Sequence, residues 1–169
     1  MSDPDRVLLV GLMGSGKTTV GRALGTRLGW PYLDNDELIE RAVGKETRRV
    51  QEEDGELALR RAESAALTLA LTTAGPVVAS VAGGVVTRPL DCDRLRSGGF
   101  VVWLRGSIPT LAERVEGTDR PWVGDDPVRA LRELYAGRAN LYESVASLIV
   151  DVDELPAESL VDQIAAALT

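Results

Sequence analysis

The sequence contains no histidine and a single cysteine, and both scarcities limit its chemistry. Without histidine, any general base or metal ligand must be a carboxylate, a hydroxyl or a lysine. The one cysteine, Cys92, can form neither an internal disulfide nor a cysteine metal site. We therefore expect aspartates to be the first candidates for acid–base chemistry, and a reducing cytoplasm to be the setting of the protein.

The sequence also lacks a long hydrophobic run and an excess of positive charge. No apolar stretch approaches the ~20 residues of a membrane span, and no signal peptide opens the chain. The formal net charge of -7 argues against a general nucleic-acid or membrane-surface partner. A length of 169 residues, 44% of them hydrophobic, predicts one domain over residues 1–169 with a sizeable core.

What the sequence does contain is a complete phosphate-binding pattern, G-x-x-x-x-G-K-[ST], at residues 11–18. The apolar run 7–10 before it has the length of a strand, and apolar residues at helical spacing follow it as far as Gly29. Glycines let backbone N–H groups turn toward an anion, and the dipole of the following helix adds to the attraction. The pattern predicts a nucleoside triphosphate site in which Lys17 reaches the β- and γ-phosphates and the Thr18 hydroxyl binds Mg²⁺.

Strand-like and helical segments alternate along the rest of the chain. We expect strands at 7–10, 32–34, 77–81, 100–104 and 148–151. Besides the helix after the phosphate loop, we expect helices at 36–43, 56–73, 89–96, 109–116, 128–142 and 157–168. The alternation predicts an α/β fold in which helices cover both faces of a parallel sheet and ligands bind at the carboxyl ends of its strands. The charged, irregular stretch at about 117–127 is a candidate lid.

Two aspartates, Asp34 and Asp36, follow the second predicted strand. From the end of a strand, carboxylates at positions i and i+2 can point into one cleft. The same residues also suit the start of a helix, since Asp34 and Glu37 form a capping-box pattern and Asp36 favours a first turn. The spacing leaves both interpretations open, and one group can serve both purposes.

Two further features have a structural and a functional interpretation. Arg60 is spaced to pair with Glu56 and Glu63, which is typical of an ordinary ion-paired helix face. Gly83 and Gly84 follow a predicted strand, where they either expose backbone N–H groups to a ligand or make a tight turn.

Three features late in the chain also allow two interpretations. Arg120 lies in the candidate lid, where it either clamps phosphates or is merely solvated. Arg138 precedes Tyr142 by one helical turn, which is typical of a cation–π contact on a helix surface. The segment 148–151 is an apolar run followed by aspartate, as in a Walker B strand, but its late position indicates the last strand of the sheet.

Six motifs taken together resemble the shikimate kinase family, in order and in spacing, over nearly the whole chain. They are GSGKTTVGR (14–22), LDNDELIE (33–40), G-E-x-x-x-R-R-x-E (55–63), GGVVT (83–87), RP (120–121) and RANLY (138–142). The resemblance implies a three-layer α/β/α fold with a five-stranded parallel sheet, a P-loop NTPase of the nucleoside-monophosphate-kinase type. It also implies a cytoplasmic, monomeric enzyme that uses ATP and Mg²⁺ to phosphorylate the 3-hydroxyl group of shikimate.

The resemblance assigns a role to each candidate residue. ATP would be held by Gly14, Ser15, Gly16, Lys17, Thr18, Thr19, Arg114 and Arg120. Shikimate would contact Asp36, Arg60, Gly83, Gly84 and Arg138, with the two arginines gripping its carboxylate. Mg²⁺ would be bound by Thr18 directly and by Asp34 through water. The catalytic set would be Asp36, which orients or deprotonates the acceptor hydroxyl, together with Lys17 and Arg120 on the phosphates.

The sequence departs from the family pattern around the acceptor. Ala82 replaces the first residue of a usual triple glycine, and Gln51 and Leu59 stand where aromatic residues are common. These departures keep open a kinase of another small hydroxylated acid or cyclitol, although the retained arginines indicate an anionic acceptor. Because alanine is strained at positive φ, we expect a negative φ at position 82, and we expect the missing Cβ to matter at positions 83 and 84.

Overall fold

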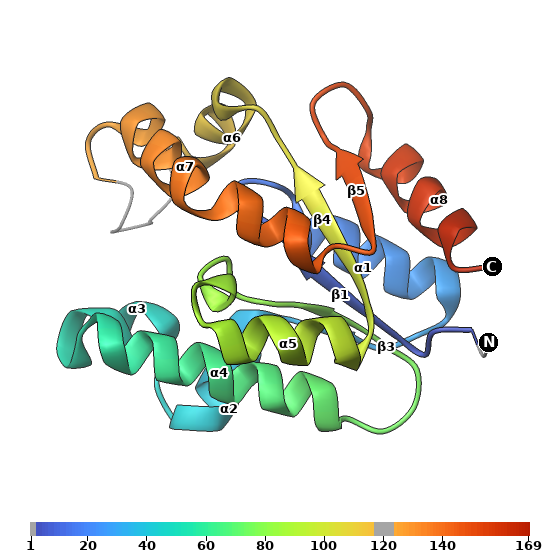
Figure 1. The fold of residues 1–169 in the computed structure, drawn as a ribbon, viewed down its shortest axis with the longest axis horizontal. Helices are drawn as coiled ribbons and strands as arrows, with labels where there is room; N and C mark the ends of the chain where they lie inside the picture. Colours follow the sequence, from blue (N-terminus) through green and yellow to red (C-terminus); the bar gives the residue numbers. More distant parts are fainter. Residues whose placement is uncertain (1–2, 117–123) are drawn as a thin grey trace.

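The computed structural model describes residues 3–116 and 124–169 of the chain. Within this part, five parallel strands form one sheet in the order β2-β3-β1-β4-β5 (Figure 1). The strands are β1 (Arg6–Val10), β2 (Tyr32–Leu33), β3 (Val77–Ser80), β4 (Phe100–Arg105) and β5 (Leu148–Asp151). Leu8 of β1 lies opposite Ala79 of β3 and Val101 of β4, so β1 is the central strand. The expected strands are therefore confirmed, and each end differs from its prediction by at most one residue.

Helices connect the strands and cover both faces of the sheet. They are α1 (Lys17–Leu28), α2 (Asn35–Val43), α3 (Thr47–Arg49), α4 (Glu56–Thr72), α5 (Pro89–Gly98), α6 (Ile108–Val115), α7 (Pro127–Val145) and α8 (Ala157–Ala167), with a π-helical turn η1 (Val50–Asp54) and a 3₁₀ turn η2 (Val85–Thr87). Helices α1 and α8 pack on one face, and α2, α4, α5 and α7 pack on the other (Figure 1). The three-layer α/β/α arrangement expected from the sequence is confirmed.

The central strand β1 is apolar throughout because it is covered on both faces. Residues 7–10 are all fully buried. Leu8 and Val10 belong to the core that includes α4 and α7, whereas Val7 and Leu9 belong to the core that includes α1 and α8. Side chains alternate between the faces of a strand, so a parallel strand between two helical layers must be hydrophobic on both.

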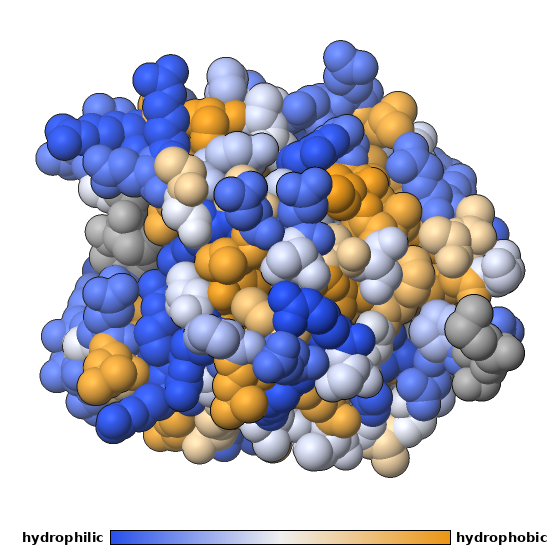
Figure 2. Space-filling view, in the orientation of Figure 1, coloured by the Kyte–Doolittle hydropathy of each residue, from blue (hydrophilic) through white to orange (hydrophobic). Residues whose placement is uncertain are grey.

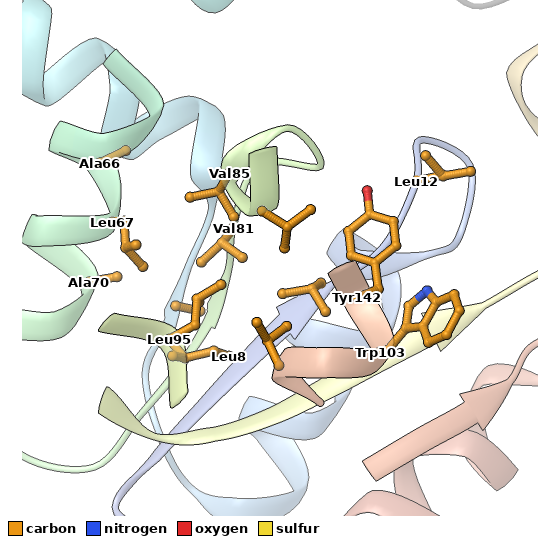
Figure 3. Close-up of a cluster of buried hydrophobic side chains, with 14 of the residues drawn as sticks. Leu8, Leu12, Ala66, Leu67, Ala70, Val81, Val85, Leu95, Trp103 and Tyr142 are labelled. Atoms are coloured by element: carbon orange, nitrogen blue, oxygen red, sulfur yellow. The ribbon is translucent and has the colours of Figure 1, made fainter. Parts of the chain in front are cut away.

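The core beneath α4, α5 and α7 changes in character from one end to the other (Figure 3). At one end, Leu67 of α4 and Leu95 of α5 are aliphatic and buried. At the other end, the rings of Tyr142 and Trp103 have centroids 5.5 Å apart. Leu12 of the phosphate loop belongs to the same core, so this loop starts from packed side chains rather than from open surface.

The segment between α2 and α4 contains helical structure that the sequence analysis did not predict. Through α3 and η1 only Val50 is buried. Ion pairs four residues apart support the segment: Arg48–Glu52 at 2.8 Å and Arg49–Glu53 at 2.9 Å. One buried apolar residue gives no hydrophobic period, so the pattern of apolar residues could not indicate this helix.

Hydrophobic and hydrophilic residues are interspersed on the face of the molecule seen in Figure 2. The end where α7 begins is strongly hydrophilic, and Arg129, Arg132 and Glu133 are exposed there. None of the helices in the described ranges combines the length and the apolar character needed to cross a membrane.

The candidate lid was expected at about 117–127. Its residues 117–123, which include Arg120, lie outside the described residues. Gly124 and Asp125 form a turn, and α7 already begins at Pro127. The Asp126 side chain accepts a hydrogen bond of 3.1 Å from the backbone N–H of Arg129 and so caps this helix. The irregular segment therefore ends at Asp126, one residue before the predicted end of the candidate lid, because an aspartate followed by proline is a favourable helix start.

Candidate active site at the carboxyl ends of the strands

A cleft of about 1010 Å³ opens where β1, β2 and β3 end. The phosphate loop, the start of α2, the segment from α3 to α4, the loop after β3 and parts of α6 and α7 line this cleft. The expected site residues on its wall are Gly14, Gly16, Lys17, Thr18, Thr19, Asp34, Asp36, Arg60, Gly83, Gly84, Arg114 and Arg138. Ser15 is buried within the loop, and Arg120 lies outside the described residues. Residues far apart in the sequence thus meet in one place.

Glycine shapes the phosphate loop between β1 and α1. Gly14 and Gly16 have φ angles of 81° and 92°, in the left-handed region that other residues rarely adopt. Helix α1 has no side-chain cap at its start, which leaves its N-terminus open to an anion. Lys17 Nζ donates hydrogen bonds to the carbonyl oxygens of Gly11, at 2.7 Å, and Leu12, at 3.1 Å. The ammonium group therefore lies over the loop, where phosphates would be bound.

Arg114 of α6 lies at the edge of the phosphate loop. Its Nη1 donates to the Gly14 carbonyl oxygen at 3.2 Å, and its Nη2 donates to the Val152 carbonyl oxygen at 3.3 Å. A Cβ atom at Gly14 would lie only 2.9 Å from the Leu111 carbonyl oxygen, so α6 packs directly against the loop backbone. The guanidinium group thereby links the loop to the segment that follows β5.

Asp34 uses its two carboxylate oxygens for different purposes. Oδ1 accepts a hydrogen bond of 2.9 Å from the backbone N–H of Asp36 and so caps α2. Oδ2 faces the phosphate loop and accepts hydrogen bonds from the Thr18 hydroxyl at 3.3 Å and the Tyr32 hydroxyl at 3.2 Å. The capping interpretation is confirmed, although the bond goes to Asp36 rather than to Glu37 as in a capping box. One oxygen of the Asp34 carboxylate thus caps α2, and the other faces the phosphate loop.

The pair of Thr18 and Asp34 offers only oxygen donors to a metal ion. Within residues 3–116 and 124–169, no group of three or more histidine, cysteine, aspartate or glutamate side chains could hold a metal ion. Mg²⁺ keeps several waters and is usually bound by one or two protein oxygens together with substrate phosphates. This donor set therefore fits Mg²⁺ that arrives with a nucleotide, rather than a metal held by protein alone.

Asp36 stands in the first turn of α2, exposed and on the cleft wall. Its Oδ1 accepts a hydrogen bond of 2.9 Å from the Thr47 hydroxyl of α3. This bond orients the carboxylate from a segment that the sequence analysis left without a role. The N-terminus of α2 also favours a negative charge at this position.

Arg60 and Glu63 of α4 form a largely buried ion pair. Nη1 of Arg60 donates to both carboxylate oxygens of Glu63, each at 2.9 Å, and the Glu63 side chain is only 8% exposed. Burial raises the pKa of the Glu63 carboxyl group, and the charge of Arg60 counteracts part of that rise. Glu56 lies 3.5 Å from Nη2 of Arg60. Both expected pairs are confirmed, but the burial of Glu63 distinguishes them from an ordinary exposed helix face.

Tyr142 of α7 is fully buried, and its hydroxyl lies between two parts of the cleft wall. The hydroxyl donates a hydrogen bond of 2.7 Å to the Gly83 carbonyl oxygen and also contacts the Arg138 guanidinium group. Burial raises the pKa of Tyr142 to about 12, so the hydroxyl keeps its proton at neutral pH. The expectation of a cation–π contact on a helix surface was wrong, because this ring lies in the core and offers its hydroxyl to the site.

The loop after β3 needs small residues for lack of space. No non-glycine residue described has a positive φ, which confirms the expectation for Ala82. Gly84 has a φ of -84°, so it is not required for backbone conformation. A Cβ atom at Gly84 would overlap with the Arg60 guanidinium group, and one at Gly83 would lie 3.1 Å from the Gly11 carbonyl oxygen of the phosphate loop. The missing Cβ atoms thus leave room for the Arg60 guanidinium group and for the backbone of the phosphate loop.

Gln51 of η1 and Leu59 of α4, two of the positions where the chain departs from the family pattern, both line the cleft. Oε1 of Gln51 is buried without a hydrogen-bond partner, and among the described side chains only Ser15 Oγ shares this state. Buried polar atoms are normally paired, so an unpaired one on a cleft wall is suited to a hydrogen bond from a ligand.

Comparison with known proteins adds an independent finding. The family model for shikimate kinase matches residues 13–169 of this chain. The shikimate kinase of Thiobacillus denitrificans is 40% identical over 153 residues, which cover 89% of this chain and 83% of that protein. The chain belongs to the shikimate kinase family.

Further relatives agree with this assignment to the shikimate kinase family. The shikimate kinase of Symbiobacterium thermophilum is 38% identical over 162 residues, covering 94% of this chain and 92% of that protein. A solved structure of the Acinetobacter baumannii shikimate kinase in complex with shikimate has a TM-score of 0.91 at 32% identity, covering 96% of this chain and 92% of that one. The fold of this family member is the α/β fold of P-loop kinases.

The sequence analysis of this shikimate kinase family member missed side chains that organise the site. Thr47, which the sequence analysis did not single out, and Tyr142, whose place in the core it did not expect, each hold a residue expected to meet the acceptor. On the nucleotide side, the Tyr32 hydroxyl lies 2.6 Å from Ser80 Oγ. Ser80 offered a signal, since it is a polar residue at the end of an otherwise apolar run and is only 2% exposed. The contacts of Tyr32, Thr47 and Tyr142 join different elements, and a single sequence does not reveal them.

Proposed function

We propose that this protein transfers the γ-phosphoryl group of ATP to the 3-hydroxyl group of shikimate. The observation that carries the proposal is a single cleft whose wall joins a complete phosphate loop to an exposed carboxylate and two arginines. Phosphoryl transfer needs mainly positioning and the neutralisation of charge, and both can be supplied by these groups.

The nucleotide half of the cleft consists of residues 11–19, Asp34 and Arg114. In our proposal, the amides of Gly14, Ser15, Gly16 and Thr19 and the ammonium group of Lys17 hold the phosphates of ATP. To pack on adenine, Arg114 would give up part of its hydrogen bonding to the carbonyl oxygens of Gly14 and Val152. Lys17 already lies over the loop, 2.7 Å from the Gly11 carbonyl oxygen, so only its tip must move to meet the β- and γ-phosphates.

Thr18 and Asp34 are the residues that would hold Mg²⁺, the first directly and the second through water. Mg²⁺ bound there supplies positive charge that offsets the charge of the β- and γ-phosphates. The 3.3 Å contact between the Thr18 hydroxyl and Asp34 Oδ2 keeps the two oxygen donors together at the mouth of the phosphate loop.

The acceptor half of the cleft consists of Asp36, Arg60, Gly83, Gly84 and Arg138. The two guanidinium groups would bind the carboxylate of shikimate, for which their planar fork of donors is suited. Glu63 engages only Nη1 of Arg60, at 2.9 Å, and the exposed Glu56 lies 3.5 Å from Nη2, so the contact with Glu56 is the one that the substrate carboxylate would replace. The Asp36 carboxylate would orient or deprotonate the acceptor hydroxyl, and the glycines would let the acceptor approach the loop amides.

A lid over this cleft completes the proposal, within a single domain of residues 1–169. We place the lid at about 117–127, with Arg120 moving onto the phosphates as a member of the catalytic set. Closure would exclude water, which otherwise competes with the acceptor hydroxyl for the phosphoryl group.

The protein would work as a monomer in the cytoplasm, on small molecules and without a nucleic-acid or membrane partner. A net charge of -7 disfavours binding to polyanionic surfaces. The single cysteine, Cys92, is buried and unpaired, which suits a reducing compartment.

A coupled assay of ADP release tests the proposal. We expect release that depends on shikimate and is far slower with gluconate, a hydroxylated acid, or with myo-inositol, a cyclitol without a carboxylate. A protein that prefers gluconate would show that the changes at Gln51, Leu59 and Ala82 have altered the acceptor. Release at one rate with or without any acceptor would refute the proposed transfer.

A further inference from the structure

The Tyr32 side chain occupies a slot in α1 that two glycines create. A Cβ atom at Gly21 would overlap with the Tyr32 ring, and one at Gly25 would lie 3.4 Å from the Tyr32 Cβ atom. Gly21 and Gly25 are four residues apart, so they lie on the same side of the helix. The slot fixes the direction of the ring and brings its hydroxyl to the end of β3.

That hydroxyl connects Asp34 with the start of α1. Tyr32 Oη lies 2.6 Å from Ser80 Oγ and 3.2 Å from Asp34 Oδ2. Ser80 Oγ lies 3.2 Å from the carbonyl oxygen of Lys17, to which it can donate. A continuous series of polar contacts therefore runs from the Asp34 carboxylate to the first residue of α1.

The Tyr32 and Ser80 hydroxyls supply only two protons for these three contacts, so only two of the contacts can be hydrogen bonds at one time. Either Tyr32 donates to Ser80 and Ser80 to the Lys17 carbonyl, or Ser80 donates to Tyr32 and Tyr32 to Asp34. A hydrogen bond to an ionised carboxylate is roughly twice as strong as a neutral one, which favours the arrangement that ends on Asp34.

We propose that Tyr32 is a positioning residue that holds Oδ2 of Asp34 toward the cation bound with the nucleotide, with Ser80 as its support. This inference rests on the proposed function, in which Asp34 binds Mg²⁺ through water. Without the Tyr32 hydroxyl, Oδ2 keeps its contact with Thr18, while Oδ1 still caps α2. Loss of the hydroxyl therefore loosens the oxygen that faces the cation without releasing the helix.

Calorimetric titration of the protein with ADP, in excess Mg²⁺ and separately in EDTA, tests this role without any turnover. The Tyr32→Phe variant keeps the ring in its slot and removes only the hydroxyl. We expect its affinity for ADP to fall about tenfold in Mg²⁺, as for one lost bond to a charged group, and to match wild type in EDTA. Tyr135→Phe removes the same group from a residue of α7 outside the cleft wall and should match wild type in both conditions.

A double-mutant cycle identifies Asp34 as the group through which Tyr32 acts. In an Asp34→Ala background, Tyr32→Phe should change the affinity for ADP in Mg²⁺ by less than about twofold, because its target is gone. Ser80→Ala removes the support alone and should weaken binding in Mg²⁺ by less than Tyr32→Phe does. Should Tyr32→Phe fail to fold, the Ser80→Ala result carries the test.

Three results would overturn the proposal. In the first, Tyr32→Phe binds ADP like wild type in Mg²⁺, which would reduce Tyr32 to a filler of the slot. In the second, the affinity falls equally in Mg²⁺ and in EDTA, which would assign the hydroxyl to the phosphate loop instead of Asp34. In the third, the effect persists in the Asp34→Ala background. A wild type that binds no ADP in either condition would instead refute the proposed function.

Discussion

The nucleotide half and the acceptor half of the cleft are built on different principles. The nucleotide half depends mainly on one continuous segment, residues 11–19, whose glycines and backbone groups form the phosphate loop. The acceptor half assembles Asp36, Arg60, Gly83 and Arg138 from separate segments. Side chains hold the acceptor half in place, whereas backbone conformation holds the phosphate loop. Substitutions in the acceptor half should therefore alter the use of shikimate and leave the use of ATP nearly unchanged.

The largest expected effect comes from Asp36, which in our proposal acts on the hydroxyl that joins the two halves. We expect Asp36→Asn to fold normally and to lose ~10²–10⁴-fold in kcat, because general-base and orienting terms have this size. Asparagine keeps an oxygen that can accept the Thr47 hydrogen bond. Steady-state kinetics and a thermal melt check both statements, and a kcat near that of wild type would contradict the catalytic role.

The next largest effect concerns the two arginines of the acceptor half. Arg60→Ala and Arg138→Ala should each raise KM for shikimate by about 10- to 100-fold, since each removes a charge-assisted bond of about 1.5–3 kcal/mol. KM for ATP should change by less than about twofold, because the nucleotide half is supported separately. Equal changes in both KM values would break the division into halves.

Stability should depend more on Arg60 than on Arg138, because Arg60 is hydrogen-bonded to the buried Glu63 carboxylate, whereas Arg138 lowers the pKa of Glu63 through its charge alone. Burial raises the pKa of Glu63, so folding favours the protonated form of this side chain. The protein therefore loses stability as the pH rises through the raised pKa and Glu63 ionises. Arg60 reduces this loss because its charge stabilises the ionised carboxylate. Arg60→Ala should therefore melt close to wild type near pH 4 but lose about 2 kcal/mol, roughly 6 °C, at about pH 7.5. A melting difference independent of pH would contradict the role of this pair.

Tyr142→Phe gives a smaller effect and sharpens the contrast with Tyr32. The two hydroxyls serve opposite halves, since that of Tyr142 bonds to Gly83 and that of Tyr32 contacts Asp34. We expect Tyr142→Phe to raise KM for shikimate by about three- to tenfold, the value of one neutral hydrogen bond, and to leave the affinity for ADP in Mg²⁺ unchanged. Weaker binding of ADP by this variant would show that the halves are coupled through α7.

The smallest effect on the use of shikimate is expected from substitution of Ala82. Substitution of the neighbouring Gly83 or Gly84 should have a larger effect. Ala82 already has an ordinary φ, so Ala82→Gly should change kcat/KM for shikimate by less than about twofold. Gly84→Ala should instead displace the Arg60 guanidinium group and raise KM for shikimate about tenfold. A gain of about tenfold or more for Ala82→Gly, about 1.4 kcal/mol, would indicate a pocket reshaped for another acid.

The same contrast explains what could be predicted from the sequence. The phosphate loop is local, so its glycines, Lys17 and Thr18 are visible as one pattern between a strand and a helix. The three inner strands β3, β1 and β4 were predictable because burial on both faces requires apolar runs such as residues 7–10. The roles of the acceptor residues were assigned through resemblance to a family, since the spacing of Arg60 by itself favours an ordinary ion pair.

The contacts that hold the acceptor half could not be predicted from the sequence. Tyr142 reaches Gly83 only because α7 crosses the core above β4, and Thr47 reaches Asp36 only because α3 folds back on α2. Nothing in the local sequence of Tyr142 distinguishes a buried hydroxyl from a ring on a helix surface. Such contacts depend on packing between elements, which periodicity and motif spacing do not encode.

In our proposal, the choice of acceptor depends on two arginines that recognise its carboxylate. The most direct measurement compares kcat/KM for shikimate with kcat/KM for its methyl ester, in wild type and in Arg60→Ala. We expect wild type to use the ester at least about a hundredfold less efficiently than the acid, because two charge-assisted bonds are weakened, and we expect this ratio to shrink in Arg60→Ala. Equal use of acid and ester by wild type would contradict recognition of the carboxylate by the two arginines.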